Sequence, residues 1–456
     1  MSLLQHWERH PYLKWGFGLF SLILLTVGCG VAVFTANHHI VAGVSIGETT
    51  AGGLERPQVV AALQRRLEPA LARQIVLTYQ KRNIYLTLGS LGIQPDYQAT
   101  VEKAYRIGRT GPLWRQAAVR WQIRRQGMAI PILFKNNRDT WLAFYRLLEA
   151  TLAIEPVRSV VKVNLAGEVS YSLSKKGRVI AAAALLKRLE EAVTNSRIVD
   201  IAIPVETETP PLTEAEIRSW SLDRLLGLFY TEFNPALTDR VHNLQMACSA
   251  LDNTLVYPGQ KFSFNTWVGP RVPEAGYREA PVIFMGKLVA GVGGGICQVS
   301  STLYNAVLLA NLKVVERYNH SLPSTYVPLA RDATLVDGGL DFVFENTNRK
   351  PVLITARVEA PYVIVAILGE KTGWEKVELE TVVAKTFPFG IKEIPDPALT
   401  VGERMKAQDG KLGFKAELWR TVTLPDGSTR KMRVNTSIYP AQPEEYKVGT
   451  NPLPEL

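Results

Sequence analysis

Residues 291–312 read GVGGGICQVSSTLYNAVLLANL, a run in which three glycines and a cysteine lead into a long apolar stretch. From Val299 to Ala310 the apolar residues recur at helical spacing, which predicts a buried helix beginning near Ser300. Ser300 or Ser301 would serve as its N-cap. Cys297 would then lie at the positive end of the helix dipole, where the pKa of a cysteine falls and the thiolate is favoured.

Two further groups that a cysteine nucleophile needs follow this helix. The segments 313–320 and 325–336 look like strands, and they carry His320 and Asp332 respectively. A helix-start cysteine followed by a histidine and an aspartate predicts a nucleophile, a base and a group that orients the base. Cys297, His320 and Asp332 are therefore the predicted catalytic residues.

The glycines before Cys297 are predicted to expose the sulfur to a substrate and to let backbone amides face an oxyanion. Asp337 and Asp341 are alternative orienters, because an irregular turn would shift the register of the second strand. The predicted oxyanion or substrate loop comprises Gly293, Gly294, Gly295 and Gln298.

Other interpretations of this segment stay open. A cysteine is often a small buried apolar residue, and one Cys/His/Asp order in 456 residues has little specificity. A phosphate-binding loop is discarded, because the Lys-Ser/Thr pair that it needs is missing. One Cys and one His without short paired spacing fit zinc poorly, so we predict no metal and no cofactor.

The N-terminus contains a run typical of a membrane span. Residues 15–36 carry no charge, whereas Arg9 and Lys14 precede them and the next basic residue is Arg56. This predicts a single-pass, uncut transmembrane anchor at 15–36, with residues 1–14 in the cytoplasm and the bulk of the chain outside. Signal-peptide cleavage and lipidation at Cys29 are the alternatives.

Composition agrees with an extracytoplasmic globular protein. The chain is 46% hydrophobic and 21% charged, with a net charge of +10, which favours anionic partners. The predicted topology excludes nucleic acid and leaves membrane headgroups and anionic wall polymer. Three cysteines do not make a disulfide framework.

The patterns predict an α+β, multidomain fold. Residues 40–215 alternate strand patterns, among them 74–79, with amphipathic helices, and residues 225–370 form an α+β middle domain. Residues 375–450 have an alternating pattern with a hairpin turn at 425–427, which predicts a small all-β module.

Residues 101–125 interleave basic and aromatic side chains. The plainer interpretation is a solvated basic helix face whose aromatic residues pack inward. The functional one is contact with anionic headgroups or wall polymer.

The middle domain resembles the VanW family, which is named for a member found in vancomycin-resistance gene clusters. The blocks PGQKFSFN (258–265), GGGICQVSSTLYNA (293–306) and YVPLARDAT (326–334) carry the resemblance over about 230–369. Residues 45–210 resemble the peptidoglycan-binding domain that commonly precedes VanW, through GETTAGGLERPQVVAAL (47–63) and AYRIGRTG (104–111).

The C-terminal region resembles the extracellular module called G-five, which is associated with wall sugars and adhesion. Its recurrent glycines are matched by Gly402, Gly410, Gly413, Gly427 and Gly449. These resemblances imply a cell-envelope protein that binds peptidoglycan or wall peptides, and they bring no catalytic residue with them.

A weaker likeness concerns the chemistry. The order of Cys, His and Asp, with 12 residues from His320 to Asp332, is similar to transglutaminase-like cysteine enzymes, although Ser321 stands where an aromatic residue often follows the histidine. Two hypotheses therefore remain: a non-catalytic binding protein, and a cysteine-dependent amidase, peptidase or transpeptidase acting on wall peptides.

Overall fold

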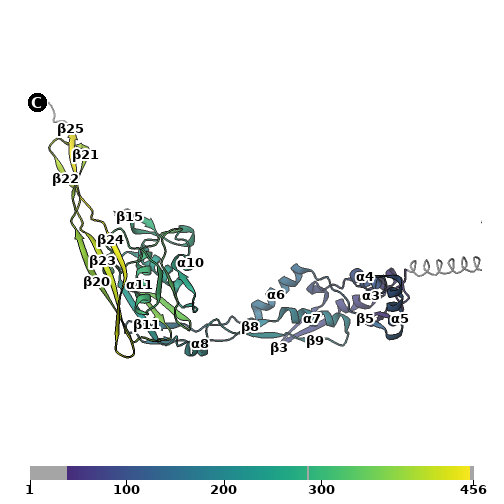
Figure 1. Cartoon of the computed structure of the whole chain (residues 1–456). Helices are drawn as coiled ribbons and strands as arrows, with labels where there is room; N and C mark the ends of the chain where they lie inside the picture. Colours follow the sequence, from purple (N-terminus) through teal and green to yellow (C-terminus); the bar gives the residue numbers. More distant parts are fainter. Residues whose placement is uncertain (1–37, 285–286, 452–456) are drawn as a thin grey trace, which may run out of the picture. The chain divides into compact units, whose positions relative to one another are not determined.

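The computed structural model describes residues 38–284 and 287–451 (Figure 1). The predicted cytoplasmic segment 1–14, the predicted anchor 15–36 and Cys29 lie outside these residues. Within the described ranges, none of the helices is both long enough and apolar enough to span a membrane.

The described chain divides into two compact units. The first unit comprises residues up to Glu155 together with Lys176–Glu208, and the second comprises Pro156–Lys175 together with everything from Thr209 onward. The hairpin inside 156–175 thus lies with the second unit, although the sequence pattern grouped it with the first. It is held there by Asn253, whose side-chain oxygen accepts the Val161 N–H at 2.8 Å.

The first unit has an α+β core. Strand β3 has the bounds predicted from sequence, Gln74–Tyr79, and pairs antiparallel with β4 and parallel with β9. The apolar faces of α3, α6 and α7 bury leucines against this sheet. The elements are β1 (Val44–Ile46), β2 (Thr49–Thr50), α3 (Arg56–Ala72), β3, β4 (Arg82–Thr87), α4 (Tyr97–Arg106), α5 (Leu113–Gln126), β5 (Met128–Ile130), α6 (Arg138–Leu152), β8 (Gly177–Ile180), α7 (Ala182–Thr194), β9 (Asp200–Ala202) and β10 (Val205–Glu208).

The second unit is built around α11 (Ile296–Leu309). This helix and α9 (Thr238–Leu251) pack on a four-stranded antiparallel sheet of order β11-β19-β18-β12, and nearly every residue of α11 is buried. The other elements before the C-terminal strands are β6 (Val161–Val163), β7 (Val169–Tyr171), α8 (Glu214–Ser219), β11 (Leu225–Glu232), β12 (Thr254–Val256), β13 (Lys261–Ser263), α10 (Phe264–Val268), β14 (Glu279–Phe284), β15 (Lys287–Val292), β16 (Lys313–Glu316), β17 (Val343–Glu345), β18 (Val352–Glu359) and β19 (Tyr362–Leu368).

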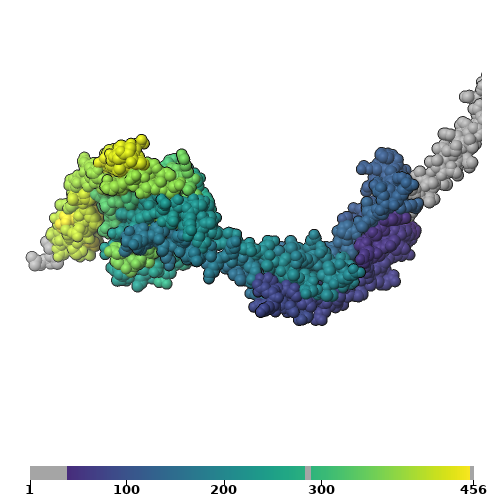
Figure 2. Space-filling model, turned by 90° about the horizontal axis from the view of Figure 1, so that it is seen from below, coloured from purple at the N-terminus to yellow at the C-terminus, as the bar shows by residue number. Residues whose placement is uncertain are grey.

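Two three-stranded sheets form the C-terminal part of the second unit. The sheet β20-β23-β24 lies against α11, and its strands cover one side of the unit (Figures 1 and 2). The predicted turn at 425–427 connects β23 to β24. The strands are β20 (Lys376–Phe387), β21 (Ile391–Thr400), β22 (Arg404–Gln408), β23 (Gly413–Thr423), β24 (Thr429–Tyr439) and β25 (Glu444–Asn451).

The predicted α+β multidomain class with an all-β C-terminal module is confirmed. The predicted helix start near Ser300 is wrong, because α11 begins at Ile296 with Gly295 as its N-cap. Gly295 has φ of 109°, which lets the chain turn into the helix four residues earlier than predicted. The Ser300 and Ser301 hydroxyls instead donate to the Cys297 carbonyl within the helix.

The two predicted strands after α11 are largely absent. Only Lys313–Glu316 forms a strand, β16, and no strand occurs between it and β17. Several backbone groups of this irregular segment bond to side chains, which satisfies them without a strand partner. The Ala330 N–H donates to the Tyr439 hydroxyl at 2.9 Å, and the Ala333 N–H donates to Ser301 Oγ at 2.9 Å.

Candidate functional site

Cys297 is the second residue of α11 and is partly exposed. The preceding glycines make the turn that places it there. A Cβ on Gly294 would lie 2.5 Å from the Ala280 carbonyl oxygen, so no larger residue fits. The buried Asn243 amide holds this turn by donating to the carbonyls of Gly294 and Arg278, at 3.1 and 2.9 Å.

His320 and Asp332 contact each other directly, although neither lies on a strand. His320 Nδ1 is 2.7 Å from Asp332 Oδ2, and the His320 backbone N–H donates to the same oxygen at 2.7 Å. Both residues are buried, with 6% and 1% of their surfaces exposed. The double contact fixes the ring orientation, and it leaves the second ring nitrogen, Nε2, free for another partner.

The Cys297 side chain lies near that of His320, and each shifts the pKa of the other. Loss of water around the sulfur would by itself raise the pKa of Cys297, but the hydrogen bond and charge of His320, the Leu335 N–H and Arg271 lower it below its ordinary value. Burial would lower the pKa of His320, yet Asp332 and Cys297 raise it to about 9. These opposite directions favour a thiolate–imidazolium pair.

Asp332 is held by donors that sequence reasoning missed. Arg317 donates to Asp332 Oδ1 at 2.8 Å, and its Nε donates to the Asp332 carbonyl at 2.6 Å. The Tyr439 hydroxyl donates to Oδ1 at 2.6 Å. Burial alone would raise the pKa of Asp332, but the bond to His320 and the charge of Arg317 hold it below its usual range.

The Gln298 side chain already has partners within the protein. Its amide donates to Thr231 Oγ1 at 3.1 Å and to the Glu232 carbonyl at 2.8 Å, and its oxygen accepts from Arg240 at 3.0 Å. Its backbone N–H donates to the Gly295 carbonyl at 2.8 Å. Gln298 therefore braces the helix start, whereas its predicted contact with a reacting group stays a prediction.

Two further side chains lie close to the sulfur. Burial raises the pKa of Tyr326, and negative charge on Cys297 raises it further, so this hydroxyl stays protonated beside the thiolate. Arg240 also interacts electrostatically with Cys297. A neutral hydroxyl and a guanidinium near a nucleophilic sulfur are groups that stabilise developing negative charge.

The alternative orienters have other partners. Asp337 forms an ion pair with Arg271, and Asp341 accepts from Ser263 and from the Asn265 N–H. Both described cysteines are free thiols, and Cys248 is buried. In residues 38–284 and 287–451, no group of three or more His, Cys, Asp or Glu side chains is arranged to hold a metal ion.

The first unit presents a different kind of surface on α5. Trp114 and Trp121 are 73% and 60% exposed, and Arg115, Arg124 and Arg125 are exposed beside them. No acidic residue occurs between Glu102 and Asp139. The expectation that these tryptophans pack inward is therefore wrong, because only Ile123 of this helix is buried.

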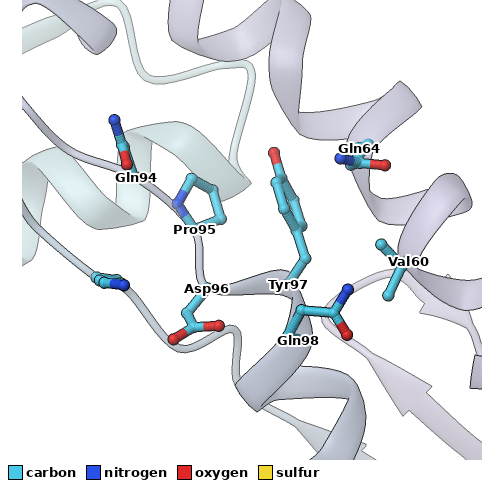
Figure 3. A pocket seen from close by; sticks show the side chains of 8 residues that line it. Val60, Gln64, Gln94, Pro95, Asp96, Tyr97 and Gln98 are labelled. Atoms are coloured by element: carbon cyan, nitrogen blue, oxygen red, sulfur yellow. The ribbon is translucent and has the colours of Figure 1, made fainter. Parts of the chain in front are cut away.

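A small polar pocket of about 240 Å³ lies between α3 and the start of α4 (Figure 3). Gln64 and Val60 line one side from α3, and the Tyr97 ring stands between them and Pro95. The Tyr97 hydroxyl is buried without a hydrogen-bond partner among the described residues. The remaining lining residues are Gln94, Asp96, Gln98 and Lys135.

Comparison with known proteins identifies three modules in the predicted order. Residues 84–200 match the family described as "Putative peptidoglycan binding domain", residues 239–368 match "VanW like protein", and residues 378–451 match "G5 domain". Modules of this kind in one chain define a cell-wall-associated protein. The Cys297 site lies inside the VanW match, except that Tyr439 and Ser437 come from the G5 match.

The protein named "Uncharacterized protein YoaR" from Bacillus subtilis (strain 168) is 36% identical over 233 residues, which cover 50% of this chain and 74% of that relative. "Vancomycin B-type resistance protein VanW" from Enterococcus faecalis (strain ATCC 700802 / V583) is 27% identical over 138 residues, which cover 29% of this chain and 50% of that protein. The chain belongs to the VanW family.

Two solved structures are similar to the C-terminal module. One, titled "IgA1 Protease G5 domain structure", is 28% identical with a TM-score of 0.14, and the match covers 17% of this chain and 95% of that one. The other, "Crystal structure of HP0197-G5", is 20% identical with a TM-score of 0.12, over 16% of this chain and 96% of that one.

Proposed function

We propose that this protein is a cell-wall-associated cysteine acyltransferase that acts on amide bonds of wall peptides. The observation that carries the proposal is the 2.7 Å contact between His320 Nδ1 and Asp332 Oδ2, with the other ring nitrogen left for the Cys297 thiol. A nucleophile, a base and an orienting carboxylate in this arrangement are the parts of a cysteine acyl-transfer site.

The chemistry would proceed in two steps. The Cys297 thiolate attacks the amide carbonyl carbon, and the resulting tetrahedral oxyanion collapses as the His320 imidazolium gives its proton to the departing amine. This leaves a thioester on Cys297 and a neutral imidazole. Water, or a second amine, then attacks the thioester while His320 accepts its proton, which releases an acid or a new amide and restores the thiolate.

Donors for the oxyanion are available next to the sulfur. The N–H of Cys297 belongs to the first turn of α11, where helix amides lack intrahelical partners. The protonated hydroxyl of Tyr326 is the second candidate donor. These two groups would take the oxyanion-binding role predicted for Gln298, because the side-chain amide and the backbone N–H of Gln298 already donate to other groups.

The flanking modules would keep the site on its polymer. The predicted membrane segment 15–36 would tether the chain, and the first unit would bind peptidoglycan. Glutamine amides and an unpartnered tyrosine hydroxyl in the pocket of Figure 3 suit a neutral, hydrogen-bonding group such as an N-acetylated sugar. The basic face of α5 suits anionic wall polymer.

Purified peptidoglycan treated with the full chain tests the enzyme proposal. Mass spectrometry of the resulting fragments should show a bond cleaved or formed by the wild-type protein and not by Cys297→Ala. Cys248→Ala serves as the matched control and should keep the activity. Identical fragments from wild type and Cys297→Ala would contradict the proposal, provided that Cys297 is shown to be reduced.

A non-catalytic envelope protein is the second candidate, favoured by the two wall-associated modules that flank the VanW match. It predicts that Cys297→Ala keeps both the fold and the sedimentation with peptidoglycan, and that no fragment changes with either protein. The fragment analysis with wild type and Cys297→Ala therefore distinguishes the two candidate functions.

A further inference from the structure

The strand β24 belongs to the G5 match, yet four of its residues form hydrogen bonds with the segment that carries His320 and Asp332. The Tyr439 hydroxyl donates to Asp332 Oδ1 at 2.6 Å, and Arg317 donates to Ser437 Oγ at 2.7 Å. The Asn319 amide donates to the Ile438 carbonyl at 2.9 Å. Asn435 donates to the Tyr304 hydroxyl at 2.7 Å and to the Ala330 carbonyl at 3.1 Å.

We infer that the site is composite and that Tyr439, supplied by the G5 module, is a positioning residue for the Asp332 carboxylate. Tyr439 does not touch the sulfur and acts through Asp332 and His320. The inference deepens the proposed function and rests on it, because a positioning role has meaning only if the Cys297–His320 pair is a reactive centre.

The hydrogen bonds on the two Asp332 oxygens show what the Tyr439 hydroxyl contributes. Asp332 Oδ2 accepts hydrogen bonds from His320 alone, from its ring and its backbone N–H. Oδ1 accepts from Arg317 and from Tyr439. Donors on both oxygens prevent the carboxylate from rotating about its last side-chain bond. Tyr439 is itself fixed, because it is 1% exposed and accepts the Ala330 N–H at 2.9 Å.

The alternative to positioning is a purely electrostatic role, and it predicts the opposite sign. A phenol that donates to a carboxylate draws negative charge away from it, so its removal would strengthen the attraction between Asp332 and the imidazolium. The thiolate would then form at lower pH. If Tyr439 positions the carboxylate, its removal leaves Oδ1 to Arg317 alone. Asp332 then turns more freely, the imidazolium is weakened and the thiolate forms at higher pH.

The test is the pH profile of Cys297 alkylation by iodoacetamide in the full chain with Tyr439→Phe, which keeps the ring and removes only the hydroxyl. We expect the rate at pH 6 to fall by about threefold to tenfold and the profile to move to higher pH. The other titratable groups that face Cys297 or Asp332 are unchanged in this variant; they are Arg240, Arg271, Tyr326, Arg317 and Tyr304.

Tyr304→Phe is the matched control. Its hydroxyl accepts a hydrogen bond from Asn435 of β24 but none from the site, so its loss should lower thermal stability without moving the alkylation profile. If Tyr439→Phe leaves the profile unchanged, or accelerates alkylation, the positioning role is overturned. Should Tyr439→Phe fail to fold, Ser437→Ala is the second variant, which acts through Arg317 and should slow alkylation by a smaller factor.

Failure of the proposed function gives a different result. If His320→Asn does not alter the alkylation profile, the thiolate–imidazolium pair is absent and the enzyme proposal falls first. If His320→Asn moves the profile and Tyr439→Phe does not, only the inference about Tyr439 falls. Because alkylation needs no wall substrate, both results are obtained even where no peptide bond is attacked.

Discussion

Helix α5 of the first unit and the Cys297 site of the second unit differ in how water surrounds their charged groups. On α5, Arg115, Arg124 and Arg125 are exposed, next to two exposed tryptophans. In the second unit, His320 and Asp332 are 6% and 1% exposed. Exposed charges act at a distance through water, whereas buried charges act through direct contacts and change the pKa of their neighbours.

This difference indicates two tasks for one chain. The arginines of α5 are not fixed by a carboxylate of their own segment, since none occurs between Glu102 and Asp139, and they remain available to an anionic surface. In the Cys297 site, the His320–Asp332 pair is instead held by internal hydrogen bonds. We therefore expect binding by the first unit to depend on ionic strength and the reactivity of Cys297 to depend on pH.

The largest expected effect compares the two described cysteines. At pH 7, Cys297 should react with iodoacetamide at least about 30-fold faster than Cys248, because an ordinary thiol with a pKa near 8.5 is only about 3% ionised there. Burial raises the pKa of Cys248 further and shields it, since it is 2% exposed. Peptide mapping by mass spectrometry gives both rates.

In denaturant the two cysteines should react alike, which serves as the control. Equal rates in the native protein would mean that the surroundings of Cys297 do not activate its thiol. The proposed contrast between a binding region and a reactive region would then fail for the reactive region.

The next effect concerns His320→Asn, which should slow alkylation of Cys297 at pH 7 by about tenfold. Loss of the imidazolium raises the thiolate pKa, although a more basic thiolate is also more nucleophilic, which limits the change. Because the pKa of His320 is raised to about 9, its charge and the stability that it contributes are present below its unfolded pKa of about 6.5 and are lost as the pH rises through about 9.

Urea unfolding at pH 7 and pH 10 measures that second consequence. The Cys297→Ala protein, which lacks the thiol whose lowered pKa acts in the opposite direction over this range, should lose stability between these values, and Cys297→Ala/His320→Asn should lose less. Equal losses in the two proteins would show that His320 is not charged at neutral pH.

The sequence predicts the members of the Cys297 site better than their surroundings. Cys297 before a helix, and His320 and Asp332 in order after it, follow from residue types and spacing, and the structure brings these three side chains together. Their catalytic roles remain a prediction. The strand expected to carry His320 ends at Glu316, and the one expected to carry Asp332 is absent. Side-chain hydrogen bonds there replace the strand pairing that an apolar alternation normally implies.

No local sequence pattern predicts that Tyr439 contacts Asp332. It lies 107 residues beyond Asp332, in a module whose strands alternate like those of any small sheet, and only the packing of that sheet on α11 brings it to the site. Arg317 was closer to prediction, since a basic residue three positions before His320 is a natural partner for a buried carboxylate. For α5, the residue spacing predicts a helix, but it does not predict which face of that helix is buried by the rest of the unit.

The smallest expected effect tests the binding half of the comparison. Replacing Arg115, Arg124 and Arg125 of the first unit together by Gln should weaken co-sedimentation of the full chain with peptidoglycan that retains its anionic polymer, by about threefold to tenfold at low salt. The same loss of three charges elsewhere in that unit is the matched control, with Gln at three exposed basic positions away from α5: Lys81, Lys187 and Arg197. If α5 is the binding face, the control retains its affinity and the α5 variant shows a shallower decline with added salt. Equal weakening by both triple variants would mean that net charge alone attracts the polymer, and α5 would then be an ordinary solvated basic helix.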